Sequence, residues 1–339
     1  KFEVKSPTMP ELIEEDGQHG DLSALLAENG YVLDNPNTER LAPLPAAVKR
    51  RIRALKTNQL KFIGLEAKFF ERVHQLEKEF EGEFSKLAEE RRLVVSGERE
   101  PSDDEVTHPL VNDVPPEKLA EWDAQSEADK GEKGIPEFWL YALKGSDHLA
   151  AMIQEHDEPV LAYLTDITTT IETEPMGYSL YFHFAENPYF ANRVVRKTYV
   201  LQCTPSEDDP FDYDGPFVKS CTADKIEWKD GKDITKKVVK KKQKKGANAG
   251  KFLTKTVKAD SFFNFFDPPT VNLDHKNEDD QDYDEDEELL VADYEAGQVI
   301  RDTIVNRAVL FFTGEAAEFD GFEDDDDEDE EELSDEDEE

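Results

Sequence analysis

A stretch of 54 residues without proline decides the fold. Residues 46–99 read AAVKRRIRALKTNQLKFIGLEAKFFERVHQLEKEFEGEFSKLAEERRLVVSGER. Alternate steps of four and three residues from Val48 to Leu87 land on an apolar residue at nine of twelve positions. This heptad spacing places the apolar side chains along one seam of an α-helix. The sequence therefore predicts one long helix, which Ser96–Gly97 and Pro101 end.

The length of this helix indicates what its seam contacts. About 50 residues at ~1.5 Å each give roughly 75 Å, whereas a compact domain of ~300 residues is only about 50 Å across. The helix exceeds the body that would cover it, which favours pairing with the same helix of a second copy. A kinked helix folded onto its own domain is the alternative. The predicted dimerisation residues are Val48, Ile52, Leu55, Phe62, Phe69, Val73, Leu76 and Phe80.

Composition excludes several classes of protein. The 339 residues include 40 Lys and Arg against 80 Asp and Glu, a net charge of -40. No run approaches 18 apolar residues, so no membrane-spanning helix is expected. The two cysteines, Cys203 and Cys221, fit a reducing compartment. An acidic surface repels nucleic acid and anionic lipid and attracts basic proteins, so we expect neither direct nucleic-acid binding nor a membrane.

Two acidic tracts are the predicted binding sites for a basic partner. Residues 278–288 hold nine acids in eleven positions, and residues 323–339 hold fifteen in seventeen. The tail cannot bury enough apolar surface to fold. It carries roughly one charge per 4 Å, less than the one per ~1.7 Å of duplex DNA. A carrier needs this difference, because DNA then displaces it from a DNA-binding protein; a merely solubilising tail is the alternative. The chosen residues are Glu278, Asp279, Asp280, Asp282, Asp284, Glu285, Asp286, Glu287, Glu288, Glu323, Asp324, Asp325, Asp326, Asp327 and Glu328.

A basic run stands out in this acidic chain. It is predicted to be a nuclear import signal on an exposed hairpin. Alternatives are an edge strand guarded by lysine and an internal partner for the acidic loop. The lysines are Lys236, Lys237, Lys240, Lys241, Lys242, Lys244 and Lys245.

The rest of the chain predicts mixed helices and strands. Short helices are expected at 21–29, 117–125, from Pro136, and over 148–164 with a bend at Pro159. Strands are expected at 168–170, 178–184 and 194–202. A hairpin is expected to join 225–228 to 234–239 around Asp230–Gly231, and helix returns over 288–312.

No pattern of catalytic residues is present in the sequence. There is no glycine-rich phosphate loop and no nucleophile elbow, and His and Cys never cluster at metal-ligand spacing. We therefore expect neither an enzyme, nor a cofactor, nor a metal. A coiled-coil adaptor with a solubilising acidic tail remains the alternative function.

Four motifs follow one another along the chain. They are Gly134–Leu140 (GIPEFWL), Tyr189–Arg193 (YFANR), Ser261–Pro269 (SFFNFFDPP) and Arg307–Ala316 (RAVLFFTGEA). The long helix precedes them and the acidic tail follows. Together they resemble the nucleosome assembly protein (NAP/SET) family of histone chaperones, in its nucleosome assembly protein 1-like branch. The resemblance covers roughly residues 20–320.

The resemblance implies an α+β fold: a long dimerisation helix, then an earmuff domain with an antiparallel sheet and underlying helices, then a disordered acidic C-terminal tail. The expected divisions are an N-terminal segment (1–45), the helix (46–100), the earmuff with a basic hairpin near 225–258 (101–317) and the tail (318–339). The implied function is ATP-independent binding of core histones, the 2A–2B dimer above all and 3–4 as a further partner. It includes shielding them from nonspecific DNA contact and depositing them in nucleosome assembly.

The family also implies a homodimer with an acidic concave face that shuttles between nucleus and cytoplasm with nuclear transport receptors. The lysine run lies where the family places its import hairpin. Leu44, Val48, Ile52 and Leu55 lie where it places an export signal, although burial in the helix seam is an alternative for these four.

Overall fold

The computed structural model describes residues 37–112, 114–125, 131, 133–206, 209–242, 252–269 and 281–316. The chain forms two compact units, residues 1–63 and 64–339, and the boundary falls within the long helix. The four domain divisions drawn from the sequence stay predictions, and the short helix expected at 21–29 lies outside the described residues.

The long helix is confirmed. Helix α3 runs from Ala46 to Val95 without interruption and ends directly before the predicted stop at Ser96–Gly97. In the first unit it follows the short helix α2 (Thr38–Leu41). Prolines 43 and 45 separate the two helices, and the Pro45 carbonyl accepts the first hydrogen bonds of α3 from Val48 and Lys49.

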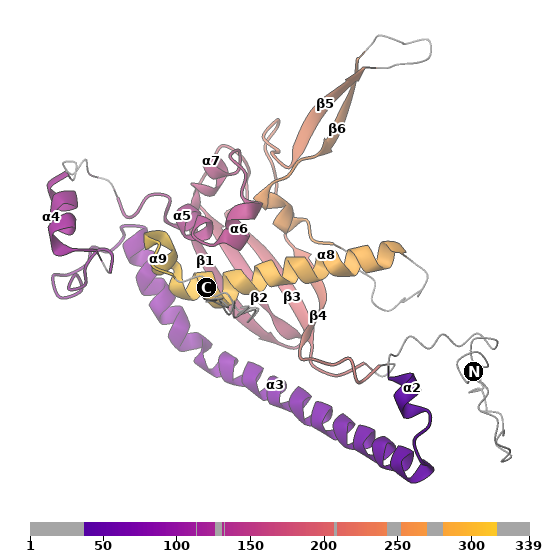
Figure 1. Ribbon diagram of the computed structural model, residues 1–339. Helices are drawn as coiled ribbons and strands as arrows, with labels where there is room; N and C mark the ends of the chain where they lie inside the picture. The colour runs from indigo at the N-terminus through magenta and orange to yellow at the C-terminus, as the bar shows by residue number, and fades with distance from the viewer. Residues whose placement is uncertain are drawn as a thin grey trace, which may run out of the picture. The chain divides into compact units, whose positions relative to one another are not determined.

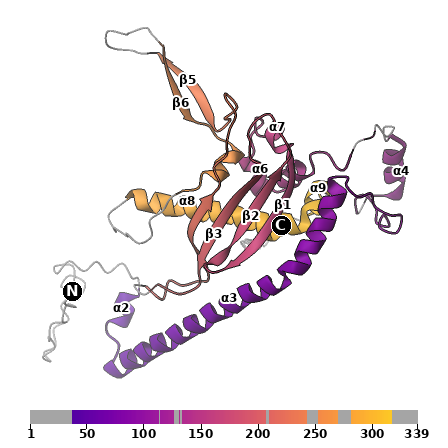
Figure 2. The same ribbon diagram turned by 180° about the vertical axis from the view of Figure 1, so that it is seen from behind.

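A four-stranded antiparallel sheet forms the centre of the second unit (Figures 1 and 2). Its strands are β1 (Leu164–Thr173), β2 (Met176–Phe184), β3 (Val194–Gln202) and β4 (Phe217–Ala223), in that spatial order. All three predicted strands are confirmed within β1, β2 and β3. Alternating burial along β3 turns one face to the core, as expected for a half-buried strand.

Helices and an aromatic turn pack on this sheet. They are α5 (Phe138–Lys144), α6 (Asp147–Met152), α7 (Glu158–Leu161), the 3₁₀ turn η1 (Phe262–Phe266), α8 (Gln281–Gln298), the π-helical η2 (Val299–Ile304) and α9 (Val305–Thr313), with α4 (Pro116–Gln125) separate. The single helix predicted over 148–164 is wrong, because the chain breaks after Met152 and Leu164 already belongs to β1. The helix predicted over 288–312 is present but contains the π-helical segment.

One buried carboxylate holds the aromatic turn in place. Asp157, fully buried, accepts hydrogen bonds from the Ser261 hydroxyl at 2.6 Å and the Phe262 N–H at 2.7 Å. Phe262, Phe263, Phe265 and Phe266 then lie in the core, where Phe182 meets Phe266 edge to face at 5.0 Å. Such pairs stabilise a core beyond the apolar area they bury.

The predicted hairpin around Asp230–Gly231 is wrong. Strand β5 (Lys236–Lys242) instead pairs with β6 (Phe252–Lys258), in a separate two-stranded sheet. Residues 225–228 bond to the loop at 189–191, and Trp228 packs edge to face on Phe190 at 5.5 Å. The half-buried tryptophan packs against the core. The free energy gained from this aromatic contact outweighs the local preference of Asp230–Gly231 for a hairpin turn.

Two glycines allow the chain to cross itself after α3. Gly97 and Gly134 both have positive φ, and a Cβ on either would collide with backbone atoms of the other crossing segment. The Ile135 N–H donates to the Val95 carbonyl at 2.8 Å. This hydrogen bond joins the end of α3 to the residues just before α5. Residues 98–133 therefore form an excursion whose two ends meet.

A buried ion pair joins the sheet to α8. Lys197 of β3 is fully buried, and its Nζ lies 2.5 Å from Asp293 Oδ2 and 3.5 Å from the centre of the Phe265 ring. The Tyr199 hydroxyl donates to Asp293 Oδ1 at 2.9 Å. Burial lowers the pKa of Lys197, and the Asp293 carboxylate opposes that shift.

We expect Asp293→Ala to lower the free energy of unfolding by about 3–5 kcal/mol, since the buried Lys197 charge loses its carboxylate and keeps only the Phe265 carbonyl and ring. Urea unfolding at one fixed protein concentration measures this. The exposed Glu295 of the same helix provides the control, Glu295→Ala, with a change within about 0.5 kcal/mol. Equal effects of the two substitutions would contradict the role given to Asp293.

Candidate functional site

An apolar stripe is exposed along α3. Of the predicted dimerisation residues, Leu55, Phe62, Phe69, Leu76 and Phe80 are 48–67% exposed, while Val48, Ile52 and Val73 are half-buried. Leu65, Phe84 and Leu87 extend the stripe, whereas the exposed Leu60 lies about 140° around the helix from Leu55. Eight large apolar side chains along one side of a helix form a patch that an isolated soluble chain rarely exposes. Of the proposed export residues, Leu44, Val48 and Ile52 are half-buried and Leu55 is exposed.

The opposite side of α3 is fastened to the edge of the sheet by polar side chains. Lys78 Nζ donates to the Ile171 carbonyl at 2.8 Å, and Glu81 Oε1 accepts from the Ile171 N–H at 2.6 Å. His74 Nε2 lies 2.7 Å from the Glu172 carbonyl oxygen. Because β1 is an edge strand, these bonds satisfy backbone groups that would otherwise be free to pair with another strand.

Arg91 fixes the C-terminal end of α3 at three points. Its guanidinium donates to the Val305 carbonyl, lies 4.8 Å from the centre of the Trp139 ring, and lies 3.9 Å from Asp166 Oδ1. Its Nε and one terminal nitrogen are buried without a hydrogen-bond partner among the described residues. Burial lowers the pKa of Arg91, and Asp166 opposes that shift.

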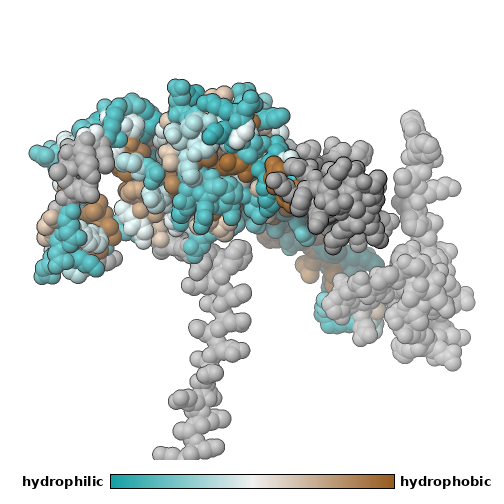
Figure 3. All heavy atoms as spheres, turned by 90° about the horizontal axis from the view of Figure 1, so that it is seen from above, coloured by the Kyte–Doolittle hydropathy of each residue, from teal (hydrophilic) through white to brown (hydrophobic). Residues whose placement is uncertain are grey.

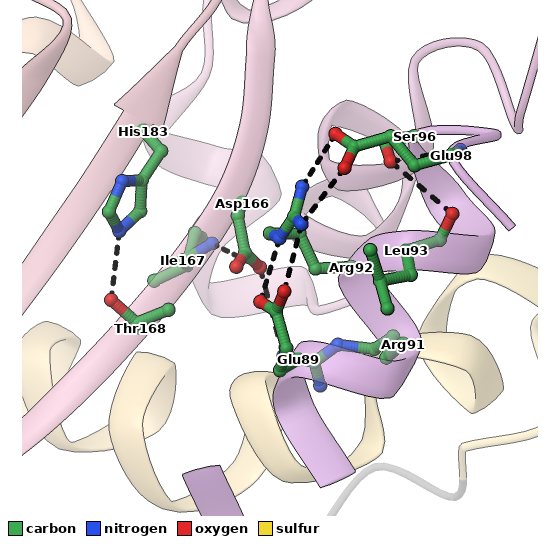
Figure 4. Close-up of polar contacts among 10 residues, drawn as sticks. All are labelled: Glu89, Arg91, Arg92, Leu93, Ser96, Glu98, Asp166, Ile167, Thr168 and His183. Carbon is green, nitrogen blue, oxygen red and sulfur yellow. Dashed lines mark hydrogen bonds and ion pairs between the residues drawn. The ribbon is translucent and has the colours of Figure 1, made fainter. Parts of the chain in front are cut away.

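Next to it, Arg92 ties the last turn of α3 to the residues that follow (Figure 4). It bonds both carboxylate oxygens of Glu89 and both of Glu98, at 2.7–3.1 Å. These hydrogen bonds raise the pKa of Arg92 and lower those of both glutamates. The chain is thus held where it leaves the helix and enters the glycine crossing.

Two titratable groups on neighbouring strands face this arginine pair. Asp166 and His183 are cross-strand partners of β1 and β2. Burial raises the pKa of Asp166 to about 6, although Arg91 and the Ile167 N–H act against the shift. Burial, and then Arg92, lower the pKa of His183, whose Nε2 lies 2.9 Å from the Thr168 hydroxyl (Figure 4).

Sequence reasoning missed this polar side of the helix. His74, Lys78 and Glu81 are spaced by four and three residues, as the apolar seam is, but offset around the helix. A second regular spacing of polar residues on one helix was the available signal. Such spacing is hard to distinguish from solvated surface, because charged helical residues usually are solvated.

The lysine hairpin is described in part. Lys236 and Lys237 lie in β5 with exposed side chains, and Lys240, Lys241 and Lys242 continue the same strand. Lys244 and Lys245 lie outside the described residues. The basic run therefore occupies a paired strand, and the structure does not bring it together with the α3 stripe into one site.

The acidic tracts are the least described of the predicted sites. Residues 278–280 and 323–328 lie outside the described residues. Helix α8 begins at Gln281, seven residues before the predicted start at 288. Its first turns therefore contain Asp282, Asp284, Glu285, Asp286, Glu287 and Glu288. Glu288 is exposed.

The described residues form neither a membrane-spanning helix nor a metal-binding group of side chains. Viewed from above, it is mainly hydrophilic, with hydrophobic residues between the polar ones (Figure 3). Among the described residues, no helix is both long and apolar enough to cross a bilayer. His, Cys, Asp and Glu side chains in the same part of the chain form no group of three placed to hold a metal ion.

Known proteins match most of this chain. The family model described as "Nucleosome assembly protein (NAP)" matches residues 50–315. Nucleosome assembly protein 1-like 1-A of Xenopus laevis is 41% identical over 311 residues, covering 89% of this chain and 78% of its own. Nucleosome assembly protein 1-like 1 of Mus musculus is 43% identical over 322 residues, with 88% and 77% covered.

Nucleosome Assembly Protein 1 from Plasmodium knowlesi is 27% identical, with a TM-score of 0.47, and the match covers 80% of this chain and 98% of that one.

Asp166 yields a pH-dependent prediction. Its pKa of about 6 in the folded protein exceeds its ordinary 3.8, so folding favours the protonated form. Its contribution to stability is complete below pH 3.8 and is lost as the pH rises through 6. Asn keeps an oxygen for the Ile167 N–H and carries no charge. We expect Asp166→Asn to raise the free energy of unfolding by about 1–3 kcal/mol at pH 7.5.

Urea unfolding at pH 4 and pH 7.5 checks this, because the advantage of Asp166→Asn should shrink at the lower pH. The control is Asp104→Asn, because Asp104 is exposed. Asp224 is also exposed, but it accepts a hydrogen bond from the Arg196 N–H and is therefore not used. An advantage that is constant with pH would show that burial does not raise the pKa of Asp166.

Proposed function

Since the chain belongs to the nucleosome assembly protein family, we propose that it is a histone chaperone that works as a homodimer. It binds core histones without ATP, favours the 2A–2B dimer, shields it from nonspecific DNA contact and deposits it on DNA. Family membership supports histone binding, and the exposed stripe of α3 is the observation that carries the dimer.

The stripe is large enough to form the centre of an interface. From Leu55 to Leu87 it runs about 50 Å along the helix, and at about 10 Å wide it offers roughly 500 Å² from each copy, to which flanking residues add. Specific complexes bury about 800 Å² from each partner. The polar bonds of Lys78 and Glu81 hold the other side of the helix against its own sheet, which leaves the stripe free for a second chain.

Charge explains both uptake and release of the cargo. The tracts 278–288 and 323–339 attract basic histone surface through exposed carboxylates. At 0.15 M ionic strength, salt screens the attraction between exposed charges that are more than about 8 Å apart. DNA has the higher charge density and displaces the chaperone.

The lysine run of β5 and the segment Leu44–Leu55 supply transport signals in this proposal. Lys236 and Lys237 are exposed, as recognition by an import receptor requires. The protein would then move between nucleus and cytoplasm with nuclear transport receptors.

The double substitution Phe69→Glu with Phe80→Glu tests the dimer. We expect it to halve the mass measured by light scattering at micromolar concentration, because charged side chains in the seam lose their burial energy and repel one another. Gln75→Glu with Ser85→Glu adds the same charge at exposed positions outside the stripe and should remain dimeric. A monomeric wild-type chain would overturn the argument from the stripe.

Histone binding is tested with the refolded 2A–2B dimer at 0.15 M and 0.5 M NaCl. We expect a defined complex at 0.15 M, and an affinity about tenfold lower, or ~1.4 kcal/mol, when the six acids 323–328 are neutralised. The control neutralises six exposed acids elsewhere: Glu100, Asp103, Asp104, Glu117, Glu121 and Glu227. A dimer that ignores histones would favour a coiled-coil adaptor instead.

A further inference from the structure

The β5–β6 hairpin carries positive charge that its own surroundings neutralise only at the base. Residues 234–259 contain ten lysines and no acid. Lys236 Nζ lies 2.6 Å from Asp233 Oδ2, and Lys258 Nζ lies 3.1 Å from Asp267 Oδ2. Lys237 and Lys255 are exposed and form no ion pair with any residue that the structure describes.

The register of the hairpin gives it little stability of its own. Lys236 stands directly opposite Lys258, and each has its aspartate partner. On the other face Lys237 and Lys255 are diagonal neighbours, without an ion pair among the described residues, and like charges on one face repel each other. A lone two-stranded hairpin is also marginal in water. Val238 and Val239 are exposed as well. An anionic partner would therefore stabilise the paired strands.

We propose that the acidic C-terminal segment Glu323–Glu339 of the same chain binds this hairpin when no basic cargo is present. The segment lies outside the described residues. Its fifteen acids complement the ten lysines. Covalent linkage gives it an effective concentration in the millimolar range, which a free polyanion does not reach.

The length of chain is sufficient for this contact. Ala316 is the last described residue, and 23 residues follow it. At about 3.3 Å per residue the first 17 of them, 317–333, span up to roughly 56 Å, which exceeds the ~50 Å diameter of a compact unit of this size. The five acids at 335–339 then remain to contact the hairpin. The tract at 278–288 is less suitable, because most of it lies in α8, which Asp293 anchors to the sheet.

This contact links cargo to transport, a consequence that rests on the proposed chaperone function. The tail that would bind histones is then the segment that covers the lysine run. A basic cargo that occupies the tail uncovers the hairpin, so an import receptor would meet it mainly on loaded chaperone.

Energy transfer within the full-length chain tests the contact. Dyes are placed at Thr256→Cys in β6 and Glu339→Cys at the tail, while Cys203 and Cys221 are buried. Labelled chain is mixed with tenfold unlabelled chain. We expect strong transfer at 0.05 M NaCl that falls by at least half at 0.5 M, because salt screens exposed charges.

Neutralising one face of the ribbon should have the effect of salt. The variant Lys237→Gln, Lys241→Gln, Lys255→Gln should lose at least half of the transfer at 0.05 M. The matched control, Lys118→Gln, Lys219→Gln, Lys225→Gln, changes exposed lysines outside the hairpin and should keep it. Wild-type transfer in the hairpin variant would overturn the contact.

Two further outcomes would overturn the proposal, and two concern histones. Loss of transfer on mixing with unlabelled chain would place the tail on the second copy and overturn the assignment to the same chain. Hairpin-dependent binding of a labelled 30-bp duplex without any tail contact would make nucleic acid the occupant and overturn it too. Refolded 2A–2B dimer should lower the transfer. Salt-sensitive transfer in a chain that ignores histones would support the contact and overturn the chaperone function.

Discussion

The two backbone groups of Ile171 are bonded by side chains of α3, and the orientation of that helix depends on these bonds. Lys78 takes the carbonyl and Glu81 takes the N–H, while Lys78 and Glu81 bond each other at 2.7 Å. The pair thus does for the edge strand what a fifth strand would do. Polar residues occupy this part of the inner side of the helix, and the large exposed apolar residues lie on its outer side.

This arrangement inverts the usual amphipathic helix, whose apolar face packs on its own core. Within the second unit, α3 contacts the sheet through His74, Lys78, Glu81 and Arg91, while most of its large apolar side chains stay exposed. Exceptions include the half-buried Phe70 and Val95, which packs against the core. The core is closed instead by α5, α8, α9 and the aromatic turn. The unit is therefore stable without the stripe, and the stripe is available for an interface.

Long, regular segments were predictable from the sequence, and contacts between distant segments were not. The extent of α3 followed from heptad spacing, and the strands at 178–184 and 194–202 from β-branched and aromatic runs. The hairpin failed because the Asp230–Gly231 signal is local, whereas Trp228 is drawn to Phe190 and Phe263 in the core. Lys197 is the extreme case: its burial depends on Asp293, 96 residues later, which no local pattern reveals.

The glycine crossing has a consequence for how this fold tolerates change in length. Because Gly97 and Gly134 bring the two ends of the 98–133 excursion together, the excursion is joined to the body of the unit at its closed ends. Between those ends, the Asn112 N–H donates to Glu315. Closing a longer loop adds little free energy, about 0.6 kcal/mol for each doubling. Insertions and deletions between the two glycines should therefore accumulate among descendants of one ancestor, while the α3–α5 junction keeps its spacing.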